Sequence, residues 1–177
     1  DDTDVEVAPP IDLSVIGVTP APRPTADEAT TELARTQLDK AIDLAARVDA
    51  PVTLEVPPTL MAELAATPEG SERLATSLDG DELVALPLLP LDVSSAVSAG
   101  RADAYTRLVR AGEDVLTEAV PTTPSRRDVW ITTEPLSAGG AEHLRDLGTR
   151  FVVIGAELYA ETISDDPVPT DRFVEAE

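Results

Sequence analysis

The segment PVTLEVPPTL, residues 51–60, decides the fold because it joins a short apolar strand directly to the start of a helix. Its first part, residues 51–56, is rich in the branched and aliphatic side chains that favour a strand. Pro57 and Pro58 cannot continue a strand, but proline is well tolerated in the first turn of a helix. A strand that passes straight into a helix is the unit from which α/β proteins are built.

The same alternation of short apolar segments and amphipathic segments continues on both sides of this stretch. Strands are expected at residues 11–18, 51–56, 82–89, 128–132 and 151–155. Helices are expected at residues 25–48, 58–66, 69–78, 92–98, 101–119 and 137–147. Strand–helix units in succession imply right-handed crossovers and parallel strands. The predicted fold class is therefore α/β, with repeated strand–helix units and a mostly parallel sheet of about five strands, either open or a partial β/α barrel.

Single residues predict where several of these elements begin, end or pack. Thr25, followed by Glu28, predicts a capping box at the start of the first helix. Pro87 predicts a bulge or an early end to pairing in the third strand. Gly112 lies on the apolar face of the fifth helix, which indicates a close approach to a neighbouring segment. Gly148 is expected to end the last helix in a left-handed conformation.

Length and composition favour one globular domain. The chain has 177 residues, of which 42% are hydrophobic, and a domain of this size buries roughly 70% of the surface of its unfolded chain. Residues 1–10 are acidic, end in two prolines and are expected to form a tail or linker. Residues 11–177 are expected to form a single α/β domain, in which 156–177 is mostly irregular apart from a short element at 170–176.

The charge and the lack of cysteine narrow the range of functions. The chain has 34 acidic and 13 basic residues and a formal net charge of −21. A GC-rich genome or a salty habitat would each produce an amino-acid composition of this kind. A surface of this sign repels phosphate, which argues against nucleic acid and anionic lipid as partners. No run of about 18 apolar residues is present, so no direct membrane insertion is expected in this segment. Without cysteine there is no disulfide, thiolate metal site or cysteine nucleophile.

The start of the chain bears on its location. It begins at Asp1, without methionine, and opens with the loose acidic segment DDTDVEVAPP. This start resembles that of a mature exported protein or of a piece cut from a longer one, although no signal peptide is visible. The expected location is therefore extracytoplasmic, either secreted or anchored to a membrane.

Two segments resemble a known type of barrel. ARVDAPVTLEVPPTL, residues 46–60, and LSAGGAEHLRDLGTRFVVI, residues 136–154, are similar to helix-to-strand segments of the glycoside hydrolase and polysaccharide deacetylase superfamily, as carried by actinobacterial cell-envelope proteins of unknown function. The resemblance implies a β/α barrel and, in metal-dependent members, two histidines and aspartates around a divalent ion. His143 is the single histidine here, so that site cannot be built and no metal is expected. The resemblance then implies a degenerate member, a carboxylate-only member or a fragment.

Acidic residues follow the expected strands, where ligands bind in parallel α/β folds. Glu55, Asp92 and Glu134 are the candidate catalytic residues, and Glu157 is a candidate ligand-binding residue after the last strand. Two carboxyl groups about 5–9 Å apart can hydrolyse a glycosidic bond if one has a raised pKa and acts as the acid. The alternative is that these acids are solvated, with Asp92 capping the helix at 92–98 and Glu55 facing a cavity or an edge.

Trp130 and Thr132 are the other candidate ligand-binding residues, because they alternate with Glu134 on one face of the fourth strand. An indole beside a carboxylate suits a sugar ring, but a single tryptophan in a strand also suits the core. Aromatic residues make up only 3% of the chain, which counts against a large glycan site. His143 lies in a polar string and is expected on the solvated surface of its helix.

The remaining motifs are absent or incomplete. There is no Gly-x-Ser-x-Gly nucleophile elbow, phosphate loop or dinucleotide pattern, and LDGDEL, residues 78–83, lacks the spacing of a calcium loop. No cofactor is therefore expected. The sequence favours a non-catalytic binding or scaffold domain of an exported or envelope-anchored protein, with a glycan or an envelope protein as partner. The alternative is a carboxylate-based glycoside hydrolase acting on an envelope glycan.

Overall fold

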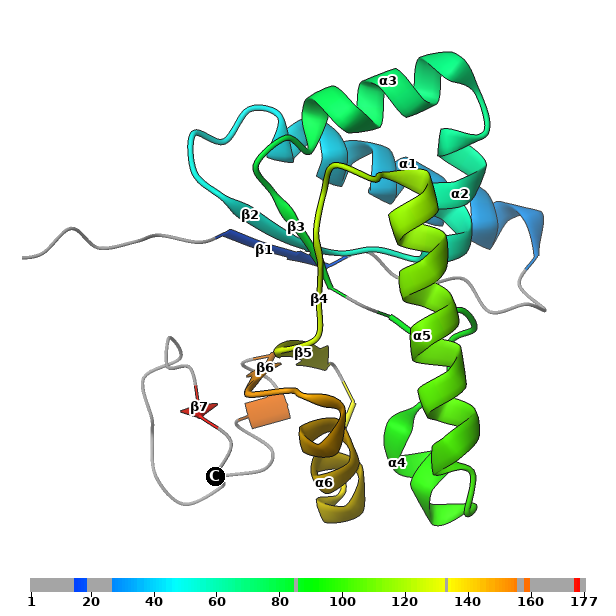
Figure 1. The fold of residues 1–177 in the computed structure, drawn as a ribbon, viewed down its shortest axis with the longest axis vertical. Helices are drawn as coiled ribbons and strands as arrows, with labels where there is room; N and C mark the ends of the chain where they lie inside the picture. Colours follow the sequence, from blue (N-terminus) through cyan, green and yellow to red (C-terminus); the bar gives the residue numbers. More distant parts are fainter. Residues whose placement is uncertain are drawn as a thin grey trace, which may run out of the picture.

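The structure is a computed structural model that describes residues 15–18, 27–84, 86–132, 134–155, 158–159 and 174–175. Strands and helices alternate along these residues, which confirms the α/β class (Figure 1). The elements are β1 (Val15–Val18), α1 (Glu28–Ala45), β2 (Val52–Glu55), α2 (Pro58–Ala65), α3 (Pro68–Ser77), β3 (Glu82–Val84), α4 (Val93–Ser98), α5 (Ala102–Ala119), β4 (Ser125–Arg126), β5 (Val129–Thr132), α6 (Ala138–Leu147), β6 (Phe151–Ile154) and β7 (Val174–Glu175). The expected tail at 1–10 lies outside the described residues, while β7 falls inside the short element expected at 170–176.

The strands form two small sheets rather than the one sheet that was expected. In the first sheet the order is β1-β2-β3-β4, and every neighbouring pair is parallel. In the second sheet β5 and β6 are parallel, and β7 pairs antiparallel with β6. Within each sheet, strands that follow one another in the chain are thus neighbours, without a reversal of order. The described strands do not close into a barrel.

Side-chain ion pairs explain why the sheet is interrupted between β4 and β5. Arg126 pairs with Glu82 of β3, while the next residue, Arg127, pairs with Glu113 of α5. The backbone carbonyl of Asp128 then accepts two N–H groups at the start of β6. The chain therefore leaves β3 after Arg126 and pairs with β6 only from β5 onward. Glu82, Glu113 and β6 are all distant in sequence from this segment. The strand expected at residues 128–132 therefore corresponds to β5, and β4 was not predicted.

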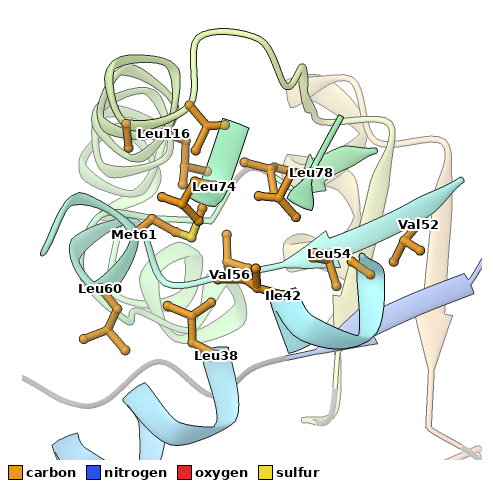
Figure 2. Close-up of a cluster of buried hydrophobic side chains, with 14 of the residues drawn as sticks. Leu38, Ile42, Val52, Leu54, Val56, Leu60, Met61, Leu74, Leu78 and Leu116 are labelled. Carbon is orange, nitrogen blue, oxygen red and sulfur yellow. The ribbon is translucent and has the colours of Figure 1, made fainter. Parts of the chain in front are cut away.

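The first core packs four helices onto one face of the first sheet (Figure 2). Its members come from α1, α2, α3 and α5 and from alternate positions of β2 and β3. Because side chains alternate across a strand, Thr53 and Glu55 point to the opposite face of β2. The largest of these buried side chains are Leu38, Ile42, Leu54, Val56, Leu60, Met61, Leu74, Leu78, Leu83 and Leu116.

A second core packs α4, α5 and α6 against β5. Its buried members are Val93, Ala96, Tyr105, Val109 and Leu144, and the partly buried Trp130 packs against them. Helix α5 contributes to both cores, and Figure 1 shows it running from α2 to α4 and α6. The described helices therefore cover one face of the strands.

Gly112 allows the close approach that its position predicted. A Cβ atom at this position would lie 2.0 Å from the carbonyl oxygen of Leu86, in the segment that follows β3. The same segment is held to α5 by the N–H of Leu88, which donates to the carbonyl of Leu108 at 2.8 Å. This contact draws the chain away from the sheet, so β3 ends at Val84 and not at residue 89, in line with the early end predicted from Pro87.

The predicted helix ends are partly correct. Gly148 ends α6 with φ at 107°, as expected. Asp27 caps α1 by accepting the N–H of Thr30, so the predicted cap at Thr25, which lies outside the described residues, is wrong. The helix begins at Glu28, so Asp27 is the residue directly before it whose side-chain oxygen reaches the free N–H groups of the first turn. Helix α1 also ends at Ala45, before the expected Val48.

Candidate functional site

Glu55 ends β2 on the face opposite the first core. The side chain is half-buried, and its Oε2 atom is shielded from solvent. Burial raises the pKa of Glu55 from 4.5 to about 7, because removing a carboxylate from water disfavours the charged form. Glu55 therefore titrates near neutral pH. Below that pH its carboxyl is neutral and can donate a hydrogen bond, and above it the carboxylate is charged and only accepts.

Asp92 is the N-cap of α4. Its Oδ1 atom accepts the backbone N–H of Ser95 at 2.6 Å, and the side chain is exposed. The capping role that its sequence position allowed is therefore confirmed. Capping uses one oxygen, and an ionised carboxylate has about four acceptor positions, so Asp92 keeps the capacity to bind a second donor.

Tyr105 of α5 is a buried residue of the second core whose hydroxyl was not recognised from the sequence. Its side chain is 0% exposed, and its hydroxyl has no hydrogen-bond partner among the described residues. Burial, then the charge of Asp92, then the charge of Glu55 raise the pKa of Tyr105, so the phenol stays protonated. Both carboxylates are thus close enough to act on it. A tyrosine in the apolar stripe of a helix is ordinarily a core residue. Its hydroxyl is the one feature from which a functional role could have been predicted.

Trp130 and His143 surround the ring of Tyr105. The Trp130 and Tyr105 ring centroids are 6.3 Å apart at 62°, and those of His143 and Tyr105 are 5.8 Å apart at 68°, both edge-to-face. Nε2 of His143 lies 3.1 Å from Oγ1 of Thr106. The expectation of a solvated His143 is wrong, because α6 packs across α4 and places it against α5. Trp130 packs against the second core, the alternative considered for it.

Glu134 and Thr132 lie apart from this group. Oγ1 of Thr132 donates to the backbone carbonyl of Glu134 at 2.7 Å and accepts its N–H at 3.1 Å, which forms the turn after β5. The Glu134 side chain is exposed and is not among the groups that act on Tyr105. Glu157 lies outside the described residues. Of the predicted acids, Glu55 and Asp92 are the two whose charges help to raise the pKa of Tyr105.

One small pocket lies at the amino end of β5, away from these acids. Its empty volume is about 230 Å³, open solvent included, and its lining residues are Val109, Arg127, Trp130, Leu144, Leu147 and Thr149. The polar groups there have partners, since Arg127 pairs with Glu113 and Thr149 Oγ1 donates to the carbonyl of Arg127 at 3.1 Å. The pocket is a mostly apolar seam between α5 and α6.

In the described part of the chain, no group of three histidines and acids is placed to hold a metal ion. No helix there has the length and apolar character needed to cross a membrane.

Comparisons with known proteins add no family. No family model, curated protein or solved structure matches this chain. The shielded carboxyl of Glu55 at the end of β2 is therefore the basis for proposing a function.

Proposed function

We propose that this chain is a non-catalytic binding domain of an exported or envelope-anchored protein, which binds a glycan at the carboxyl ends of its parallel strands. The observation that carries the proposal is the shielded carboxyl of Glu55 at the end of β2, on the face opposite the helices. Ligands of parallel α/β folds bind at this edge.

The chemistry of Glu55 supports a ligand with hydroxyl groups. Burying a charged carboxyl costs free energy, and the neutral form of the group costs less. With its pKa raised to about 7, much of Glu55 is neutral in mildly acidic solution. A neutral carboxyl donates one hydrogen bond and accepts others, which matches the donors and acceptors of sugar hydroxyl groups.

We also infer a partial β/α barrel as the finer fold. Two observations support it: within each sheet, strands consecutive in sequence are neighbours, and the helices of each core pack against one face of its strands. A doubly wound sheet would instead reverse its strand order and carry helices on both faces. The resemblance to the glycoside hydrolase and polysaccharide deacetylase superfamily at residues 46–60 and 136–154 agrees with a barrel of this kind.

A carboxylate-based glycoside hydrolase is the second candidate, and one observation favours it. A carboxyl group with a pKa near 7 suits a general acid. Its partner would have to be Asp92, which already caps α4, or Glu134, which is exposed in the turn after β5. These roles make the binding domain the better supported proposal.

The test is calorimetric titration at pH 6 with soluble peptidoglycan fragments and chito-oligosaccharides. Four proteins are compared: the wild type, Glu55→Ala, Glu55→Gln and the exposed control Glu118→Gln. We expect Glu55→Ala to lose at least about tenfold in affinity, or about 1.4 kcal/mol. Glu55→Gln should bind nearly as well as the wild type, because the amide keeps one donor and one acceptor, and the control should bind unchanged.

Three results would change this conclusion. Absence of binding to every glycan, or full affinity in Glu55→Ala, would contradict the proposal. Release of shorter oligosaccharides by the wild type but not by Glu55→Gln would replace it with the glycoside hydrolase.

A further inference from the structure

The two hydrophobic cores share no residue, and α5 is the only described element that contributes to both. The described strands also belong to two sheets that do not pair with each other. Figure 1 shows β5, β6 and α6 at the opposite end of α5 from α1 and α3. Residues that share a core tend to unfold together, and parts of a protein with separate cores can open separately. We call residues 127–154, which carry β5, α6 and β6, the second unit.

Apolar contacts hold the second unit loosely. Among the described residues, Leu144 is the only fully buried side chain that this unit contributes to the second core. Its other contributions to that core are partly buried: Trp130, Leu136 and Leu147. The pocket of about 230 Å³, open solvent included, lies at its seam with Val109 of α5. Few buried apolar contacts and a seam that is not closely packed are features of a segment that opens easily.

Ion pairs at residues 126–128 connect the second unit to the rest of the molecule. Arg126 pairs with Glu82 of β3 and with Asp128, both at 2.5 Å. Arg127 pairs with Glu113 of α5, whose side chain is only 16% exposed. Glu113 is the least exposed acid among the ion pairs of the described residues. Since burial lowers the effective dielectric constant and keeps salt ions away, this pair is the strongest of the connections.

The backbone of the same residues holds the amino ends of β5 and β6 together. The Oγ1 atom of Thr149 donates to the carbonyl of Arg127 at 3.1 Å. The N–H groups of Arg150 and Phe151 donate to the carbonyl of Asp128 at 2.8 and 2.9 Å. Residues 127 and 128 therefore bind β6 through their backbone, while Arg127 binds α5 through its side chain.

We propose that Arg126 and Arg127, with Glu82, Glu113 and Asp128, form an ionic clasp that holds the second unit closed. When these pairs are screened by salt or removed, the second unit opens from α5 and β3 while the first core stays folded. Opening exposes the part of α5 that belongs to the second core. This conformational switch does not depend on the proposed glycan binding.

The charge of the second unit gives the switch a distinct response to salt. Residues 127–154 contain three arginines and four acids, a net charge of −1, although the whole chain has −21. Salt relieves repulsion among the acids of the whole chain, but it relieves little within a unit that is nearly neutral. For the second unit, screening of the clasp is therefore the larger effect.

The experiment measures native-state hydrogen exchange of the whole chain at pH 7, in 0.05 and 0.5 M NaCl. In low salt, we expect the protection factors of hydrogen-bonded amides in β5 and β6 to be at least about tenfold below those in β2. In high salt, protection in β5 and β6 should fall about threefold, while protection in β2 should stay the same or rise.

Variants of the clasp test the role of the ion pairs directly. Arg127→Met and Glu113→Gln should each lower protection in β5 and β6 by roughly three- to tenfold and leave β2 unchanged. The double variant should lose no more than the larger single effect, because both changes remove the same pair. Arg35→Met is the matched control. It breaks the pair of Arg35 with Glu63 next to the first core, so β5 and β6 should keep their protection.

Each contrary result would overturn a named part of the proposal. Equal protection of the two sheets in the wild type would mean that the chain opens as one cooperative unit. Unchanged protection of β5 and β6 in well-folded Arg127→Met and Glu113→Gln would show that the ion pairs do not hold the second unit. If both variants fail to fold, the salt series on the wild type still decides, since protection of β5 and β6 that rises with salt would contradict the clasp.

Discussion

At the scale of single residues, the carboxyl of Glu55 links the stability of this protein to pH. Its folded-state pKa of about 7 lies above the ordinary value of 4.5, so the folded protein holds this proton more tightly than the unfolded chain does. The resulting stabilisation is complete below the unfolded value and is lost as pH rises through 7. Above pH 7 the group is ionised in both states, and the folded protein must accommodate a half-buried charge.

Glu55→Gln should therefore change stability in a pH-dependent way. Relative to the wild type, the variant should gain about 2 kcal/mol between pH 5 and pH 8.5, a value reduced to allow for the solvent that reaches this side chain. Urea unfolding at the two pH values measures the difference. For the exposed control Glu118→Gln the difference should be the same at both. An equal effect of Glu55→Gln at pH 5 and pH 8.5 would show that burial does not shift this carboxyl.

Gly112→Ala should destabilise the protein by about 2–3 kcal/mol, even though alanine is the better helix former by about 1 kcal/mol. The added methyl group would lie 2.0 Å from the Leu86 carbonyl oxygen, a backbone atom that can move only with its segment. Gly139→Ala is the matched control in α6. Its Cβ would meet a movable methyl group of Val97 at 3.2 Å, so stability should stay within about 1 kcal/mol. Chemical denaturation of both variants tests this contrast, and equal effects would contradict it.

These residues show what a sequence can reveal about single positions. Gly112 could be recognised because a glycine that interrupts the apolar face of a helix usually marks a close contact with a neighbouring segment. Glu55 could be selected because the end of its strand was predicted well, whereas Asp92 was selected from a strand end expected at residue 89 that lies at Val84. Tyr105 could not be selected, since its ring belongs to the core and only its neighbours in space make the hydroxyl unusual. Glu134 was grouped with the other acids because the sequence does not reveal the turn that leaves its side chain in solvent.

At the scale of elements, one buried carboxylate holds the start of β2. Asp81, just before β3, accepts the N–H of Val52 at 2.9 Å, although the two residues are far apart in sequence. Val52 opens the strand that carries Glu55, so this bond helps to fix where the strand begins. The sequence did not predict this hydrogen bond, since nothing local marks Asp81 as different from Asp79.

Asp81→Ala should cost about 1–3 kcal/mol, because it leaves a buried N–H without an acceptor. Asp79→Ala, in the same turn but exposed, should cost less than about 0.5 kcal/mol. Hydrogen exchange at Val52 adds a local measurement, since its amide should lose protection in Asp81→Ala and keep it in Asp79→Ala. Similar unfolding free energies for the two variants would contradict this role.

The break between β4 and β5 marks the limit of prediction at this scale. Hydrophobic periodicity located the strands and helices because each buries one face, and that information is local. The break depends on Arg126 and Arg127, which pair with Glu82 and Glu113 on opposite sides of the chain. A pattern read along one segment does not contain these partners, so the strand at 128–132 was predicted and the short β4 was not.

At the scale of the whole molecule, two electrostatic effects respond to salt in opposite directions. The net charge of −21 makes the folded chain repel itself, and salt weakens this repulsion. Salt also weakens the attractive pairs, such as Arg35 with Glu63 and Arg73 with Asp39 and Asp43. These pairs are partly exposed, and pairs of this kind contribute roughly 0–1 kcal/mol each. The repulsion among the many acids should therefore dominate.

We expect the melting temperature to rise by about 5 °C between 0.05 and 1 M NaCl at pH 7, which corresponds to roughly 1–3 kcal/mol for a chain of this size. Scanning calorimetry in NaCl and KCl measures the shift, and the two salts should agree because screening depends on ionic strength. Sucrose at matched osmolality separates screening from exclusion of solute at the surface, and it should give the smaller rise. A melting temperature that falls with salt would mean that the ion pairs stabilise the folded chain by more than the repulsion among its acids destabilises it.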